Sequence, residues 1–218
     1  TNLYCGPEND TKISSFRCQF STAVIEDGPV KATLAVYIKF DLPVSLSEDR
    51  RSRIEETVEC PLTHYISLYK GSDLVHVITE IDNKARDHRL RIQFPTGMNI
   101  EDYQAESNFD VVTRRVCSHE PDKNAKELSQ ALPQKSFLDI TDGKNGIAFF
   151  NIAIPEYEVI RSNRGAEVIF NLMRCVGRLG RSDLYTRNSG AAPYKEIPGA
   201  QNIKKNYFEY GIVLHNGS

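Results

Sequence analysis

The sequence has no tryptophan, only two methionines and no excess of charge of either sign. Its 218 residues include 27 Lys and Arg against 29 Asp and Glu, a formal net charge of −2. This balance argues against a nucleic-acid or anionic-membrane partner, because those polyanions require a basic surface. No apolar run approaches the roughly 18–20 residues of a membrane span. With 40% hydrophobic and 26% charged residues, the composition is typical of a folded globular protein.

Cysteine is sparse, odd in number and widely spaced. The five thiols are Cys5, Cys18, Cys60, Cys117 and Cys175. No CxxC pair or Cys/His cluster is present, which argues against a zinc site and a disulfide framework. We expect buried free thiols and a cytoplasmic protein, while a single Cys5–Cys18 disulfide stays open. The chain opens at Thr1 without a leader and stops abruptly, so we also expect a piece excised from a longer polypeptide.

Strict alternation of apolar and other residues is the dominant pattern. Between Pro29 and Phe40 six apolar residues alternate, which predicts a strand with one face on a core and the other toward water. In the segment 166–174, Val168, Phe170 and Leu172 share one face opposite Glu167, Ile169 and Asn171, and we expect this strand to be covered on both sides. Similar short runs predict strands at 65–69, 74–81, 90–94, 109–116, 147–154 and 207–214.

Turn residues separate these runs, and helical patterning is scarce. Gly with Asp, Asn or Ser predicts hairpins at 27–28 and 70–73 and a further turn at 142–146. The segment 47–59 fits either one helical turn or an exposed connection, and 124–132 is a second short helix candidate. Loops are expected at 101–108, 120–134 and 186–206. About ten strands without an internal repeat or a composition break predict one all-β domain over 1–218, a large antiparallel two-layer sandwich.

Two arginine-containing segments are candidate binding sites. In the first, Asp87, His88, Arg89 and Arg91 fit either sugar or phosphate recognition through bidentate hydrogen bonds or, as we favour, a strand entry with ion-paired residues on its solvent face.

In the second segment, Asp110 and Arg114 share one face of a predicted strand and Arg115 lies on the other. Recognition of hydroxyl groups by an arginine and a structural salt bridge are equally open for this group.

An acidic pair, Glu156 and Glu158, has the i, i+2 spacing that places two carboxylates on one strand face, roughly 7 Å apart, which resembles the pair of a glycoside hydrolase. Catalytic pairs come as a rule from different elements across a cleft, so we do not expect catalysis here. The five histidines show no HxH or HExxH spacing, and no metal site is expected.

Several short motifs, taken in order over most of the chain, resemble the C-terminal region of family 38 glycoside hydrolases, the α-mannosidase type. The likeness is to the compact prokaryotic members, which include mannosylglycerate hydrolases. The motifs are Ile81-Asp82-Asn83, Asp87-His88-Arg89-Leu90-Arg91, Phe94-Pro95-Thr96, Phe109-Asp110-Val111-Val112 with Arg114, Gly146-Ile147-Ala148, Pro155-Glu156-Tyr157-Glu158, Leu172-Met173-Arg174-Cys175-Val176-Gly177, Leu179-Gly180-Arg181 and Pro198-Gly199-Ala200-Gln201.

The resemblance implies a galactose-mutarotase-like β supersandwich. It also implies that the complete enzyme is a retaining hydrolase, with an Asp nucleophile and a zinc ion in an N-terminal domain that nothing in 1–218 matches. We therefore expect no catalytic residue, metal ligand or cofactor in this chain. The family segment that aligns with Asp110, Arg114 and Arg115 carries an Arg that borders the sugar-binding cleft. The expected partners are the enzyme's own N-terminal catalytic domain and a mannoside.

Three functions stay open from the sequence. The favoured one is a domain without catalytic groups that supports the active-site cleft of an α-mannosidase-type hydrolase. The second is a stand-alone carbohydrate-binding β-sandwich, against which the absence of a tryptophan platform counts. The third is a complete small enzyme that uses Glu156 and Glu158 or a histidine. An isolated domain of the first kind should expose an apolar patch, so self-association into a homo-oligomer is also expected.

Overall fold

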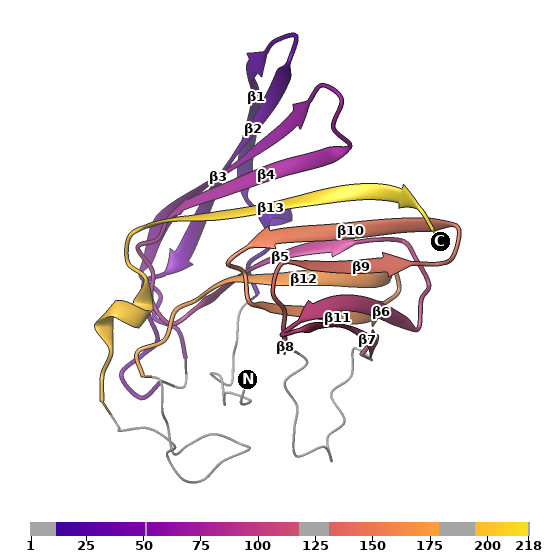
Figure 1. The fold of residues 1–218 in the computed structure, drawn as a ribbon. Helices are drawn as coiled ribbons and strands as arrows, with labels where there is room; N and C mark the ends of the chain where they lie inside the picture. Colours follow the sequence, from indigo (N-terminus) through magenta and orange to yellow (C-terminus); the bar gives the residue numbers. More distant parts are fainter. Residues whose placement is uncertain (1–11, 51, 118–130, 179–194, 218) are drawn as a thin grey trace.

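The computed structural model describes residues 12–50, 52–117, 131–178 and 195–217, and in these ranges the protein is built of β-strands (Figure 1). Thirteen strands form two antiparallel sheets, one of nine strands and one of four. The sheets face each other, which confirms the predicted all-β two-layer sandwich. Among the described residues, no helix has the length and apolar character needed to cross a membrane.

The larger sheet has the order β1 (Gln19–Asp27), β2 (Lys31–Pro43), β3 (Thr57–Tyr69), β4 (Leu74–Asp82), β13 (Lys205–Asn216), β10 (Asn145–Ile152), β9 (Phe137–Thr141), β6 (Asp102–Ser107) and β7 (Asp110–Arg115). The smaller sheet has the order β5 (Arg89–Pro95), β12 (Gly165–Arg174), β11 (Glu156–Ser162) and β8 (Leu132–Pro133). Two short 3-10 turns complete the described elements: η1 (Ser15–Arg17) and η2 (Pro198–Gln201).

Tight turns join neighbouring strands where the sequence predicts them. Asp27 and Gly28 connect β1 to β2, and Gly71, at φ 80°, lies between β3 and β4. Between β9 and β10, Asp142 Oδ1 accepts hydrogen bonds at 2.8 Å from the N–H groups of Lys144 and Asn145. The β3–β4 turn uses a left-handed glycine and the β9–β10 turn an aspartate that satisfies the backbone, whereas the β1–β2 turn is closed by the hydrogen bond from Gly28 N–H to the carbonyl oxygen of Lys31 at 2.9 Å.

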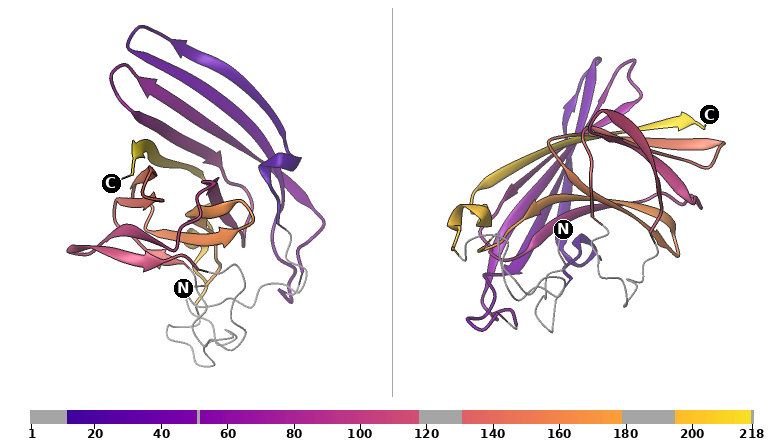
Figure 2. Two further views of the ribbon diagram at one scale, coloured as in Figure 1. Left: turned by 90° about the vertical axis from the view of Figure 1, so that its right-hand side faces the viewer. Right: turned by 60° about the horizontal axis from the view of Figure 1, so that its bottom comes forward.

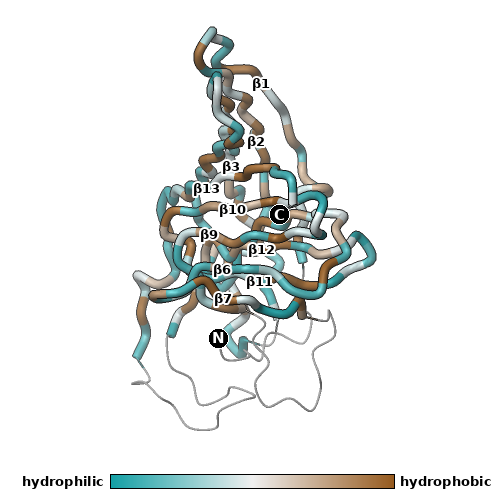
Figure 3. Tube along the Cα trace, turned by 45° about the vertical axis from the view of Figure 1, so that its right-hand side comes forward, coloured by the Kyte–Doolittle hydropathy of each residue, from teal (hydrophilic) through white to brown (hydrophobic). Residues whose placement is uncertain are grey.

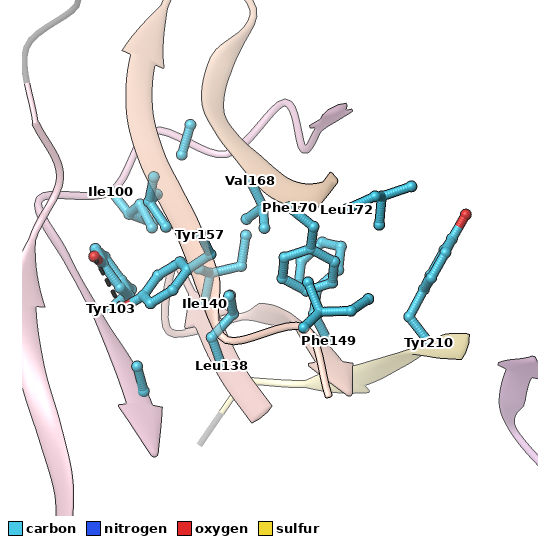
Figure 4. Close-up of a cluster of buried hydrophobic side chains, with 14 of the residues drawn as sticks. Ile100, Tyr103, Leu138, Ile140, Phe149, Tyr157, Val168, Phe170, Leu172 and Tyr210 are labelled. Carbon is cyan, nitrogen blue, oxygen red and sulfur yellow. Dashed lines mark hydrogen bonds between the residues drawn. The ribbon is translucent and has the colours of Figure 1, made fainter. Parts of the chain in front are cut away.

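The main hydrophobic core lies between the two sheets (Figure 4). Its centre is an aromatic group whose ring centroids are 5.2 to 6.3 Å apart: Phe94, Phe149, Phe170 and Tyr210. Strand β12 is buried from Ala166 to Met173, which confirms that it is covered on both faces. Alternate side chains of β12 therefore reach the core, while the other set lies on the outer face of the smaller sheet.

The smaller sheet covers only part of the larger one. Figures 1 and 2 show β1 to β4 rising away from the four-stranded sheet. On β2, Ile38 and Phe40 are buried, as predicted, and pack in a second cluster with Cys60, Leu62 and Ile81. Figure 3 shows that apolar residues continue along β1 and β2 beyond this cluster.

Further along β2 the predicted inner face is open. Leu34 is exposed, and Ala35, on the opposite face, is buried instead. The prediction of a continuously buried face over 29–40 is therefore wrong for the first half of the strand. No second layer covers that part of the sheet within the described residues.

One local prediction is also wrong, and one alternative is decided. The segment 101–108, expected as a loop, contains β6, which pairs with β7 and β9. In the described part of 47–59 there is no helix; Leu46 bridges Arg53, and β3 begins at Thr57. The helix candidate 124–132 and most of the predicted loops 120–134 and 186–206 lie outside the described residues. Cys18, Cys60, Cys117 and Cys175 are free thiols, of which only Cys60 and Cys175 are buried, and Cys5 is outside the described part.

Phe170 gives a direct test of the core. Its side chain is fully buried and contacts three other rings, so Phe170→Ala removes apolar burial and leaves a cavity. We expect the free energy of unfolding, measured by urea denaturation, to fall by about 3–5 kcal/mol. Phe16→Ala, at a phenylalanine that is 91% exposed, should change it by less than about 0.5 kcal/mol. Equal effects of the two changes would contradict the position of the core.

Candidate functional site

Three segments that are distant in sequence meet around Asp87, just before β5. The backbone N–H of Asp87 donates to Gln201 Oε1 at 2.9 Å, and Gln201 Nε2 donates to Asp87 Oδ1 at 3.0 Å. Arg50 Nη2 lies 3.4 Å from the same carboxylate oxygen. Gly177 leaves room for this arrangement, because a Cβ there would lie 3.3 Å from Gln201 Nε2. We call Arg50, Asp87, Gly177 and Gln201 the Asp87 joint.

Asn83 extends the Asp87 joint to the end of β4. Its side chain is buried, and Nδ2 donates to the carbonyl oxygens of Gln201 at 3.1 Å and Asn202 at 3.0 Å. Oδ1 accepts from the N–H of Ala85 at 3.2 Å. The amide therefore satisfies backbone groups of two chain segments at once, which fixes η2 against the end of the larger sheet.

His88 packs beside the joint as a neutral side chain. Its Nε2 lies 3.9 Å from the sulfur of Cys175, and its buried Nδ1 meets no hydrogen-bond partner among the residues that the structure describes. Burial lowers the pKa of His88 and raises the pKa of Cys175 to about 12. A nucleophilic cysteine must be a thiolate, so this pair is arranged for packing. Asp87 and His88 thus lie in a buried joint rather than on the solvent face of a strand.

Arg89 and Arg91 lie on the outer face of the smaller sheet and converge on one carboxylate. Arg91 Nη2 is 2.5 Å from Glu158 Oε2, and Arg89 Nη1 is 3.7 Å from Glu158 Oε1. The Glu158 side chain is only 10% exposed. Both of its oxygens therefore face guanidinium groups, so the carboxylate is already engaged by two ion pairs. This arrangement argues against catalysis by Glu156 and Glu158.

The three predicted sugar-contact residues lie on β7, the edge strand of the larger sheet. Arg114 points to the inner face, where its Nη1 donates to Tyr157 Oη at 2.8 Å and to the carbonyl oxygen of Pro133 at 2.9 Å. Asp110 accepts a hydrogen bond from the N–H of Val111 at 2.8 Å. Arg114 thus donates to acceptors on β8 and β11, and among the described contacts there is no ion pair between Asp110 and Arg114, the salt bridge that the sequence left open.

Arg115 lies on the opposite face of β7 from Arg114. Its side chain is exposed, and within the described part of the chain it makes no hydrogen bond or ion pair. The two adjacent arginines therefore differ in role. Arg114 joins the edges of the two sheets, whereas the guanidinium group of Arg115 is accessible to a ligand.

A cavity of about 600 Å³ opens elsewhere, between the segment after β5 and the turn from β11 to β12. It contains none of the predicted site residues; its lining consists of Pro95, Gly97, Asn99, Ser162, Asn163, Arg164 and Gly165. Over the four described ranges, no group of three or more His, Cys, Asp or Glu side chains is placed to hold a metal ion.

The two-sheet architecture and the ordered motifs together define the chain as a β domain of a glycoside-hydrolase family. Residues 7–174 match the model of the glycosyl hydrolases family 38 C-terminal domain, and the chain belongs to this family.

Three relatives show how the chain compares with longer proteins. A putative mannosylglycerate hydrolase of Halalkalibacterium halodurans is 24% identical, over 99% of this chain and 24% of its own length. A family 38 glycosyl hydrolase of Enterococcus faecalis has 28% identity and a TM-score of 0.80 over 99% of this chain and 25% of its own. An α-mannosidase from E. faecalis V583 has 28% identity and a TM-score of 0.81 over 97% and 24%, respectively. The chain thus spans about a quarter of each relative.

From the sequence, Asp87 and Arg114 were identified as candidate site residues, but the side chains that they contact were not. Gln201 and Asn83 lie in the quoted motifs Pro198-Gly199-Ala200-Gln201 and Ile81-Asp82-Asn83, and their polar side chains within those motifs were the available signal. Tyr157, whose hydroxyl oxygen accepts a hydrogen bond from Arg114, lies between Glu156 and Glu158, the residues considered as a possible catalytic pair. No local pattern reveals these contacts, since the partners are 43 and 114 residues apart.

Removal of the Asn83 side chain tests the joint. Asn83→Ala leaves the carbonyl groups of Gln201 and Asn202 and the N–H of Ala85 without that partner. We expect the free energy of unfolding to fall by about 1–3 kcal/mol in urea titrations. The exposed Asn99 is the matched control, and Asn99→Ala should be close to neutral. A neutral effect of Asn83→Ala would contradict the assigned role.

The buried His88 predicts a pH effect. The imidazole of the unfolded chain takes up a proton near pH 6.5, whereas burial lowers the pKa of folded His88. Below that pH the unfolded state binds more protons, so the free energy of unfolding falls as the pH falls. In His88→Leu the decline between about pH 7 and pH 5 should be shallower. Urea titrations at several pH values measure it; a slope unchanged from the wild type would refute the assignment.

Proposed function

We propose that this chain is the C-terminal β domain of an α-mannosidase-type glycoside hydrolase, and that it supports the active-site cleft while catalysis belongs to an N-terminal domain. The observation that carries the proposal is the family match over residues 7–174 together with the coverage of only a quarter of each relative. The free thiols of the described cysteines support a cytoplasmic enzyme.

The chemistry of the described residues supports a domain without a catalytic centre of its own. Glu158 is held by two arginines, His88 is buried and neutral, and Cys175 is a protonated thiol. The zinc ion and the nucleophile that the family resemblance implies belong, in this proposal, to the N-terminal domain. The described residues offer no group of ligands that fits such a metal, and no step of the reaction is assigned to them.

Arg115 is the residue through which this domain contacts the carbohydrate. An exposed guanidinium presents up to five N–H donors in a fixed fork, which suits the hydroxyl oxygens of a sugar. Its neighbour Arg114 already donates to Tyr157 and Pro133, and Asp110 is at the start of the strand. In this arrangement Arg114 positions the edge strand, and Arg115 orients the mannoside.

The Arg115 assignment is tested in the full-length enzyme. Arg115→Ala should lower kcat/KM for an aryl α-mannoside by about 10- to 100-fold, mainly through KM, because a charged hydrogen bond to the substrate is lost. The matched control is Thr113→Ala, on the same exposed face of β7, which should leave kcat/KM unchanged. If Arg115→Ala also leaves it unchanged, or if Thr113→Ala lowers it as much, Arg115 is not the sugar contact.

The domain assignment itself has a separate test. The reading frame upstream of Thr1 should encode several hundred residues with the zinc and nucleophile motifs; a stop codon followed by a start codon directly before Thr1 would refute the proposal. The chain expressed alone should not hydrolyse an aryl α-mannoside. Hydrolysis that is lost in Glu156→Gln would instead favour the small complete enzyme, and mannoside binding by the chain alone would favour a stand-alone binding module.

A further inference from the structure

The apolar face of the larger sheet continues past the sandwich. Residues that point to the same face as the core remain exposed on the part of β1, β2 and β3 that has no four-stranded sheet opposite it (Figure 2). We define this overhanging face by five residues: Phe20, Val24, Ala32, Leu34 and Leu68. Directly paired residues of antiparallel strands share a face, so the register places these residues together and adds Thr22 and Asp27 of the edge strand β1.

One row of paired residues shows that the overhanging face is an extension of the core. Ile81, Leu62, Ile38 and Phe20 are neighbours across β4, β3, β2 and β1. Their exposed fractions are 0%, 3%, 7% and 70% in that order. The same apolar row therefore begins in the second hydrophobic cluster and ends uncovered on the edge strand.

A second row, closer to the tip of the sheet, is uncovered earlier. Val77 on β4 is 7% exposed, whereas Leu34 on β2 is 37% and Val24 on β1 is 66% exposed. Ile66 on β3 joins them in the register. At the next position, Leu68, paired with Ala32, is 52% exposed. The exposed fraction of these side chains thus increases toward the edge strand and toward the tip of the sheet, as expected where a second layer ends.

The opposite face of the same strands is polar and already satisfied. Lys31 and Glu26 form an ion pair at 2.8 Å, and the hydroxyl groups of Thr33 and Ser67 are 3.0 Å apart in a buried hydrogen bond. On that face Thr33, Ala35 and Ser67 are 4%, 0% and 4% exposed, so it is already packed, whereas the apolar side chains of the overhanging face still lack a covering layer.

We propose that the overhanging face is the docking surface of this domain for the N-terminal part of the same polypeptide, which covers it with a layer of aliphatic and aromatic side chains. This inference rests on the proposed function. The relatives have additional polypeptide that could form such a layer, because this chain corresponds to only about a quarter of their length.

The size of the overhanging face favours a tethered partner over a second copy. The five side chains expose roughly 400 Å² of apolar surface, within the range of about 300–600 Å² for the largest such patch on a monomer, which is often functional. Independent chains in a standard stable complex bury about 800 Å² each. A layer joined to the domain through the chain needs less, since tethering supplies an effective concentration of the order of millimolar. The face is therefore smaller than one side of a standard complex, and a layer that belongs to the same polypeptide is the occupant that needs no further area.

Cysteine labelling of the full-length enzyme tests the proposal. Leu34→Cys and Leu68→Cys place thiols on the overhanging face, and Lys39→Cys places one on the exposed opposite face of β2. The rate of alkylation of each introduced thiol is followed by mass spectrometry of its own peptide, so the native cysteines do not interfere. We expect the first two thiols to react at least about 30-fold more slowly than the third, because exchange-type labelling of a buried site requires local opening.

Labelling of all three thiols at the same rate would overturn the proposal. Protection of positions 34 and 68 that disappears on dilution to the monomer would also overturn it, in favour of a second copy. Protection that persists on dilution supports it. The proposed function fails separately: a long polypeptide that protects these positions but does not hydrolyse aryl α-mannosides would keep the docking surface and refute the enzyme class. Conversely, an active enzyme with unprotected thiols would refute only the docking surface.

Discussion

Every part of this structure depends on the burial of alternate side chains between two sheets of unequal width. The aromatic group around Phe170 and Phe149 fills the centre, where nine strands face four. Because the smaller sheet is narrow, it covers the middle of the larger one and reaches the edge strand β7 through Arg114, but it leaves the far part of β1 and β2 without a covering strand in the described part of the chain. The two open edges carry the features with functional interest: Arg115 on one, and the overhanging face on the other.

The polar side chains at the end of the sandwich have a different task. Asp87, Gln201 and Asn83 satisfy backbone groups where β4 ends, β5 begins and η2 leads toward β13. A buried backbone group without a partner costs about as much as a lost hydrogen bond, so these contacts allow the chain to change direction without exposing the core. The polar and ionisable groups around Asp87 and His88 therefore stabilise the end of the sandwich and do not form a reaction centre.

Much of this arrangement could be predicted from the sequence. Strands such as 90–94 and 166–174 and the turns at 27–28 and 70–73 follow from period-two alternation and from residues that accept unusual backbone angles, which are local properties. Strand β6 was missed because its buried positions are only Tyr103 and Ala105 among polar residues, a weak local signal. The site was predicted as a group of residues, Asp110, Arg114 and Arg115, without the contacts that distinguish them.

The sequence by itself determined the all-β class, the alternation of faces, the ordered motifs and the candidate arginines, since each depends on residues close together in the chain. Tertiary structure alone decided which of those faces are covered and which charges are already paired. Leu34 and Ile38 are equivalent in the alternation, yet only Ile38 is buried, because the layer that covers it ends before Leu34. Likewise Arg114 and Arg115 are adjacent, but Arg114 donates to Tyr157, 43 residues away, while Arg115 is exposed and has no polar contact within the described residues.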